Sequence, residues 1–310
     1  QTEYSAWLIL SIIYSVLYMP TLALSNSITF AHISDPENDF PKLRVWGTIG
    51  WIVASWVFPM IWLQQGLHFQ WMPPFIVGAE VSNVTSRLAD ALKFSGLISI
   101  TYGAFCFLLP HTPPKKDATE KLAFKKAFKL FRFSSFTTLV IASLAVSVIH
   151  QIYFLQTGPF LSHLGILDSQ IGPAMTIGQF AEILTMAYLG FFLKRMGFHK
   201  VITIGVAAYF MRYAIFGTDA LPVWVMVVSQ AFHGFCYAFF FATAYIYVDK
   251  LADQDVRHSA QTVFGIIILG GGPVIGGWLS GYLQNMYTVD NVFSFSNFWY
   301  TMSAIGLVTM

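Results

Sequence analysis

One carboxylate stands alone inside a long apolar segment of this sequence. Glu182 is the single acidic residue in the run from Ile171 to Leu193. A charged side chain at the centre of a membrane helix costs about 2.5–3.5 kcal/mol, so such residues usually face a protein interior or water. Burial disfavours the charged form of a carboxyl group, and a nearby cation favours it, so small changes around the group move its proton. Glu182 is therefore the first candidate for proton coupling.

Helical spacing places two further sets of polar residues on single faces. Gln179 lies three residues before Glu182 and shares its face. Arg44, Thr48 and Trp51 stand at i, i+4 and i+7, which puts a cation, a hydroxyl and an indole in one column. Either this column forms a binding surface, or Arg44 reaches the headgroups at the end of its span and leaves the other two residues as packing.

The composition identifies the class of protein. Hydrophobic residues make up 56% of the 310 residues and charged residues 10%, against roughly 25% charged residues in a soluble domain. The apolar residues fall into runs of about 20, the length that crosses a bilayer as a helix. These features predict an all-α, multi-pass protein of the cell membrane, the inner membrane in a bacterium. The formal net charge of +2 is too small to indicate nucleic-acid binding.

Motifs for covalent chemistry are missing from the sequence. Cys106 and Cys236 each lie in an apolar run, which indicates neither a disulfide framework nor a metal site. The sequence has no Gly-rich phosphate loop followed by Lys-Ser/Thr and no His-Glu-x-x-His motif. We therefore expect no enzyme, no catalytic residue, no metal and no cofactor.

Nine apolar segments are long enough to be membrane spans. Lys and Arg are unevenly divided between the connections, and cytoplasmic connections carry the excess. Of the 17 basic residues, fourteen lie in one alternate set of connections, two lie in the other set, and Arg212 lies inside a span. We expect the first set to face the cytoplasm. The predicted spans are 6–31, 43–64, 88–110, 134–161, 169–193, 200–217, 221–248, 260–284 and 293–310.

A basic connection divides the predicted spans into two groups. Residues 1–110 hold three spans, residues 111–133 form a cytoplasmic linker, and residues 134–310 hold six spans, the last of them incomplete. The amphipathic stretch Leu122–Phe133 is expected to lie on anionic lipid. Related halves are typical of secondary transporters, so we expect the first group to be the remnant of an N-terminal half that lacks three spans.

Arg212 is the alternative partner of Glu182. Glu182 lies twelve residues before Lys194, and Arg212 lies twelve residues after Lys200. With a rise of about 1.5 Å per residue, both side chains lie at a similar depth on consecutive antiparallel spans. Charges buried in a membrane commonly pair. An ion pair that only stabilises the fold therefore stays open beside a role in proton or substrate handling.

Several short motifs together resemble those of a known transporter family. They are Tyr18-Met-Pro-Thr-Leu22, Asp39-Phe-Pro41, Arg44-Val-Trp-Gly-Thr-Ile-Gly50, Gln179 with Glu182, and Arg257-His-Ser-Ala-Gln261. On these residues the sequence resembles the proton-linked nucleoside permeases of the major facilitator superfamily, from the family's fourth span into its twelfth. The resemblance implies import of a nucleoside, driven by an inward proton gradient, through a cavity between two six-helix halves.

The resemblance also implies which residues bind the substrate. Trp51 would stack on the base, while Arg44 and Thr48 would hydrogen-bond sugar hydroxyls or base carbonyls. Residues of the second half would line the cavity opposite this column, and Glu182 would carry the proton. The substrate-binding residues expected from the second half are Gln151, Gln179, Glu182, His233 and Tyr237.

Two positions depart from the pattern of that family. Phe154 stands one turn after Gln151, where an Asn is expected, and Ala238 stands where an acid can follow Tyr237. Without the second acid, Glu182 is the one acidic candidate for proton uptake. His233 offers a second titratable group, since small changes in environment move histidine across physiological pH.

We therefore predict a monomeric secondary transporter that imports nucleosides by proton symport, with a nucleoside-like solute, protons and membrane lipid as its partners. Two alternatives remain open because of Phe154 and Ala238. One is a proton-coupled permease for a sugar or another polyhydroxylated solute. The other is a membrane sensor that uses the same fold without transport.

Overall fold

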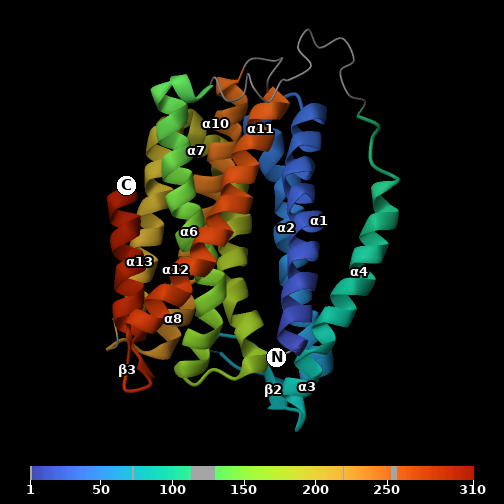
Figure 1. Cartoon of the computed structure of the whole chain (residues 1–310), viewed down its shortest axis with the longest axis vertical. Helices are drawn as coiled ribbons and strands as arrows, with labels where there is room; N and C mark the ends of the chain where they lie inside the picture. Colours follow the sequence, from blue (N-terminus) through green and yellow to red (C-terminus); the bar gives the residue numbers. More distant parts are fainter. Residues whose placement is uncertain (1, 72, 113–129, 219, 253–256) are drawn as a thin grey trace.

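The computed structural model describes residues 2–71, 73–112, 130–218, 220–252 and 257–310, and most of them are helical (Figure 1). Six helical segments among these residues are long and apolar enough to cross a membrane. They are Tyr4–His32, Pro36–Leu63, Ser134–His163, Asp168–Phe216, Val223–Leu251 and Ser259–Met286. The prediction of a mostly α-helical chain with several helices able to span a membrane is thereby confirmed.

The N-terminal helices, residues 2–112, contain two long helices that lie close together and one that stands apart. Helix α1 covers Thr2–His32, and α2 covers Pro36–Phe58 and continues into the π-helical turn η1, Pro59–Leu63. The short α3, Val84–Leu88, leads into α4, Asp90–Cys106, which has no buried residue and lies at the edge of the molecule (Figure 1).

Helix α2 begins earlier than the predicted span 43–64 because its first turn is charged and well capped. The Asp35 carboxylate accepts a hydrogen bond from the Asn38 backbone N–H at 3.2 Å, and Pro36 occupies the first helical position. Both features favour a helix start. A hydrogen bond from the Asn38 side-chain amide, together with the one from its backbone N–H, holds the pKa of the Asp35 carboxyl below its usual value. A search for apolar runs alone misses this polar turn.

The C-terminal helices, residues 130–310, begin with two elements that run back and forth. A 3₁₀ turn, η2 at Leu130–Arg132, precedes α6, Ser134–His163. Element α7, Asp168–Phe216, consists of two helices joined at Gly197, whose φ of 77° suits glycine. Phe216 packs against Phe160 near the end of α6, with ring centroids 5.1 Å apart. The second helix of α7 therefore returns to the level at which the first one began.

The remaining helices are interrupted by π-helical turns. One segment runs through α8 (Val223–Ser229), α9 (Phe232–Phe235), η3 (Cys236–Ala242) and α10 (Thr243–Leu251). The next runs through α11 (Arg257–Gly265), η4 (Ile266–Gly271) and α12 (Gly272–Met286). A two-stranded hairpin, β3 (Thr288–Val289) and β4 (Val292–Phe293), leads to α13, Phe295–Thr309.

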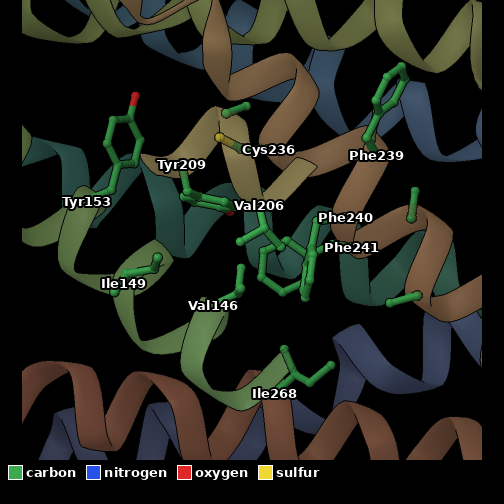
Figure 2. Close-up of a cluster of buried hydrophobic side chains, with 14 of the residues drawn as sticks. Val146, Ile149, Tyr153, Val206, Tyr209, Cys236, Phe239, Phe240, Phe241 and Ile268 are labelled. Carbon is green, nitrogen blue, oxygen red and sulfur yellow. The ribbon is translucent and has the colours of Figure 1, made fainter. Parts of the chain in front are cut away.

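The core lies among the C-terminal helices. Figure 2 shows apolar side chains from α6, from the second helix of α7 and from η3 meeting in one cluster, with Tyr209 beside Cys236 and Val206 beside Phe240. The helices approach closely at Gly205, where an added Cβ would lie 2.8 Å from the backbone N of Phe240. Small residues permit such close packing between membrane helices.

The two groups of helices meet where α2 runs antiparallel to the first helix of α7. Near one end, an added Cβ on Gly190 would lie 2.8 Å from the Asn38 side-chain oxygen. Near the other end, the Trp56 indole N–H donates to the Thr176 hydroxyl at 2.8 Å. The contact between the groups therefore extends along most of α2.

A β-hairpin in the N-terminal part of the chain hydrogen-bonds to the start of α7. Strands β1, Gln64–Phe69, and β2, Ile76–Glu80, pair so that Gln64 lies opposite Glu80. The Ser169 backbone N–H donates to the Glu80 carboxylate at 2.8 Å, and the Gln64 side-chain amide donates to the Ser169 carbonyl at 2.9 Å. A carboxylate at a helix N-terminus accepts an otherwise unpaired N–H.

At the opposite end of the molecule, Lys250 lies 3.5 Å from Glu37.

The predicted linker 111–133 is described only at its ends, since residues 113–129 lie outside the described part of the chain. The amphipathic stretch from Leu122 lies mostly in that gap. Its interaction with lipid, and the division of the chain into a remnant half, a linker and a second half, stay predictions.

Two glycines allow α7 and α9 to cross with their backbones in contact. An added Cβ on Gly234 would lie 2.5 Å from the Ala181 carbonyl carbon and 2.6 Å from the Glu182 backbone N. On the facing helix, an added Cβ on Gly178 would lie 2.7 Å from the Cβ of His233. This crossing brings His233 next to Glu182.

We expect Gly234→Ala to destabilise the protein, because the new methyl group meets backbone atoms that cannot turn away. Overpacking of this kind costs about 1–3 kcal/mol. The free energy of unfolding, measured by denaturant titration in detergent micelles, should fall by that amount. Gly281→Ala in α12 is the matched control, since nothing lies within 4 Å of its added Cβ. Equal effects of the two substitutions would contradict the close crossing.

Candidate functional site

The Glu182 carboxylate lies where α2, α7 and α9 meet, and only 3% of the residue is exposed. The Thr48 hydroxyl of α2 donates a hydrogen bond of 2.6 Å to its Oε1. The other oxygen, Oε2, lies 3.8 Å from Nε2 of His233. Each oxygen thus faces a different group of helices, one N-terminal and one C-terminal. Buried carboxylates require such partners because an unpaired charge is costly.

Arg212 contacts His233 and does not reach Glu182. Its Nη1 lies 3.0 Å from Nδ1 of His233, and it has no exposed surface. The ion pairs recorded among the described residues do not include Glu182 with Arg212. The direct pair considered from the sequence is therefore replaced by a chain in which the His233 ring lies between the two charges.

Three tyrosine rings surround the Arg212 guanidinium. The centroids of Tyr153, Tyr209 and Tyr213 lie 4.0, 5.4 and 4.9 Å from its Cζ. The Tyr213 hydroxyl also accepts from Nη2 at 3.1 Å and donates to the Ile149 carbonyl at 2.7 Å. Aromatic faces attract a cation that has lost its water. This enclosure stabilises a positive charge for which the described part of the chain shows no carboxylate in contact.

Each residue of the α2 column contacts a different C-terminal element. Arg44 donates from Nε to the Tyr237 hydroxyl of η3 at 2.9 Å, and its guanidinium carbon lies 4.5 Å from the centroid of that ring. Trp51 meets Phe154 of α6 edge to face, with centroids 5.4 Å apart. With the bond from Thr48 to Glu182 between them, the column lies against the C-terminal helices along three successive turns.

The contacts found among the described residues do not join two of the predicted residues, Gln179 and Gln151, to Glu182. Gln179 is 3% exposed, and its Oε1 has no hydrogen-bond partner among the described residues. Gln151 packs against α12, because an added Cβ on Gly276 would lie 3.1 Å from the Cβ of Gln151. The structure therefore brings together Arg44, Thr48, Trp51, Glu182, His233 and Tyr237, while it places the start of the Gln151 side chain against a neighbouring helix.

Several neighbours of this cluster were not singled out from the sequence. The Tyr209 hydroxyl lies 2.6 Å from Nδ1 of His150, and the rings of His150 and His233 stack with centroids 5.5 Å apart. The Tyr153 hydroxyl donates to the side-chain oxygen of Gln230 at 2.8 Å. The signal was the three-residue spacing of His150 and Tyr153 in one apolar run and the presence of Tyr209 in another, and such patterns are also common in ordinary packing.

The chemistry of this cluster is proton exchange and hydrogen bonding. Glu182 can hold a proton, and Arg44, Thr48, Trp51 and Tyr237 present donors and aromatic faces beside it. A carboxylate that accepts from Thr48 binds that hydroxyl more strongly when it is ionised than when it is protonated. A change in the proton on Glu182 therefore changes a contact between the two groups of helices.

Comparison with known proteins relates this chain to nucleoside transporters. The model of the nucleoside H+ symporter family matches residues 1–310. The putative nucleoside transporter YegT of Escherichia coli (strain K12) is 32% identical, over 96% of this chain and 69% of YegT. Nucleoside permease NupG of the same organism is 29% identical, over 99% of this chain and 73% of NupG. A crystal structure of a mutant of the nucleoside transporter NupG has a TM-score of 0.71 at 27% identity, over 94% of this chain and 72% of that one.

These matches confirm the resemblance found in the sequence motifs and the prediction of a membrane transporter rather than an enzyme. They also confirm that the arrangement of the helices is that of the NupG transporter. By its match over the whole of residues 1–310, this chain belongs to the nucleoside H+ symporter family.

Proposed function

We propose that this protein imports nucleosides together with protons and that Glu182 binds the coupled proton. One observation carries the proposal. The Glu182 carboxylate is buried at the contact between the N-terminal and C-terminal helices, with Thr48 of one group on Oε1 and His233 of the other group facing Oε2. A proton bound there acts on the contact that must change when the two groups move apart.

The substrate binds between the α2 column and the C-terminal helices. In this structure Arg44 donates a hydrogen bond to the Tyr237 hydroxyl, and the ring of Trp51 packs edge to face against that of Phe154. A nucleoside can replace both contacts. Its sugar hydroxyls and base carbonyls can accept hydrogen bonds from Arg44, and its base can stack on the aromatic rings. Gln179 adds a buried oxygen that lacks a partner among the described residues.

Coupling follows from the strength of the bond between Thr48 and Glu182. An ionised Glu182 accepts a charge-assisted hydrogen bond that holds α2 against α7, and hydrogen bonds to charged groups contribute about 1.5–3 kcal/mol. Protonation weakens this bond and removes the charge from the apolar interior. The loaded carrier then changes the side to which its binding site opens, as in transporters whose two repeats rock about a fixed site.

We further propose nine spans, equivalent to the fourth to twelfth of a twelve-span major facilitator. Element α7 supplies two of them, one on each side of Gly197, and the shorter α4 and α13 supply one each. The basic connections face the cytoplasm by the excess of Lys and Arg in them. The protein acts as a monomer, and its basic linker lies on anionic lipid.

Reconstitution of the protein in proteoliposomes with an inward proton gradient tests the function. We expect labelled uridine to accumulate inside, and we expect the accumulation to stop when a protonophore removes the gradient. Labelled maltose is the test solute for a sugar permease. Uptake of maltose but not of uridine would overturn the nucleoside assignment, and uptake of neither would favour a sensor.

Glu182→Gln is expected to abolish uridine accumulation against a gradient, because the amide cannot take up and release a proton. Exchange of internal for external uridine should continue, since it needs no net proton movement. Asp290→Asn, in the exposed turn between β3 and β4, is the matched loss of one carboxylate and should transport as the wild type does. Undiminished accumulation by the Glu182 variant would refute its role.

Thr48→Val should lower the free energy of unfolding by about 1.5–3 kcal/mol, since it removes a hydrogen bond to a buried charged group while it keeps the shape of the side chain. Thr48→Ser retains the hydroxyl and is the control. Denaturant titration at neutral pH in detergent micelles measures both. If valine and serine give the same value, the bond to Glu182 does not hold α2 in place.

A further inference from the structure

The hydrogen bond between Arg212 and His233 has a defined direction. A guanidinium group carries only donors and keeps its proton in proteins. At 3.0 Å from Nη1, the Nδ1 atom of His233 must therefore accept. A neutral imidazole with a free lone pair on Nδ1 carries its proton on Nε2. That nitrogen is the one that faces Oε2 of Glu182, at 3.8 Å.

We propose that Arg212 is a positioning residue that locks His233 in the neutral tautomer with its proton on Nε2, so that Glu182 is the only proton-binding group of the pair. This inference rests on the proposed function, which gives the proton on Glu182 its meaning. Arg212 does not touch the substrate in this proposal. It acts through the imidazole ring, whose N–H it directs toward the carboxylate.

The hydrogen bond between Arg212 and His233 is maintained because neither side chain can readily change its conformation. Arg212 is fully buried among Tyr153, Tyr209 and Tyr213, and Tyr213 is fixed in turn by the Ile149 carbonyl. His233 is 1% exposed, and its ring stacks on that of Tyr153 with centroids 5.2 Å apart. Rotation of either side chain would leave a buried polar group without a partner, which costs about 1–3 kcal/mol.

The charges around His233 also oppose an imidazolium ion. The titratable and charged groups that act on it are His150 and Tyr153 from α6, Glu182 and Arg212 from α7, and Arg44 from α2. Arg212 is in contact, whereas the one carboxylate is at 3.8 Å and is shared with Thr48. A second cation on His233 would have to break the bond to Arg212, because Nδ1 would then carry a proton that points at a donor.

The fixed tautomer of His233 keeps the coupled proton on Glu182. A proton that reaches Glu182 cannot pass to His233, since Nε2 already carries one and Arg212 covers Nδ1. The pair therefore binds one proton at a time, on the carboxylate. Without Arg212 the ring would be free to take a proton of its own, and the site would bind a second proton in the pH range in which histidine titrates.

The tautomer can be measured directly by ¹⁵N NMR of the full protein with labelled histidine in micelles. His233→Gln identifies the signals of His233 by their loss. In the wild type we expect a pyridine-like Nδ1 and a pyrrole-like Nε2 with no change between about pH 5 and pH 8, the range that brackets an ordinary histidine. A proton on Nδ1, or titration of His233 in the wild type, would overturn the proposal without reference to transport.

Two substitutions at Arg212 then test the cause. Arg212→Lys keeps a side chain that only donates and should preserve the tautomer. Arg212→Gln can accept from Nδ1, so we expect His233 to titrate between about pH 5 and pH 7 in this variant. A His233 ring that stays neutral in Arg212→Gln would show that Arg212 does not hold the tautomer. Should the Gln variant fail to fold, the wild-type tautomer and the Lys variant still decide the proposal.

Transport gives a second readout that separates this proposal from the proposed function. The ratio of protons to uridine taken up by proteoliposomes should rise in Arg212→Gln below about pH 6 and return to the wild-type ratio in the double variant Arg212→Gln, His233→Gln. An unchanged ratio in the single variant would overturn the role of Arg212 while wild-type transport stands. A wild type that moves no nucleoside would overturn the proposed function and leave the NMR result valid.

Discussion

Burying the charge of Glu182 is costly, and the contacts around its carboxylate offset that cost. A carboxylate in an apolar interior is stable only where donors reach it. Here the donors come from two groups of helices, because Thr48 belongs to α2 and His233 to α9. The charge therefore links the groups as long as it is present. A structural ion pair confined to the C-terminal helices would link nothing across that contact.

Backbone packing sets the distances that this arrangement requires. Gly178 and Gly234 allow α7 and α9 to cross so closely that no side chain separates their backbones. The His233 ring is then held between Glu182 and Arg212. The glycines matter to the site through distance, although they carry no chemistry of their own.

The sequence allowed the helical class, the family and the two helical faces around Glu182 to be predicted, because period and hydropathy are local properties. Thr48 and Glu182 were placed in the same site only through the resemblance, since 134 residues separate them and no local pattern joins them. Spacing from Lys194 and Lys200 predicted Arg212 at the depth of Glu182, and both side chains lie next to the His233 ring. It did not reveal that His233 lies between them, because the crossing angle of α9 depends on tertiary packing. The start of α2 at Pro36 was missed because its first turn is polar.

Position 238 holds alanine, although the resemblance to the family allows an acid there. Position 238 is fully buried in η3, two residues after Cys236, within the same cluster of helices. A carboxylate there would be a buried anion that needs donors of its own. In this chain aromatic faces stabilise Arg212, and Arg212 donates a hydrogen bond to Nδ1 of His233. Under the proposed mechanism, a His233 that also took up protons would weaken the link between one proton on Glu182 and one movement of the helices.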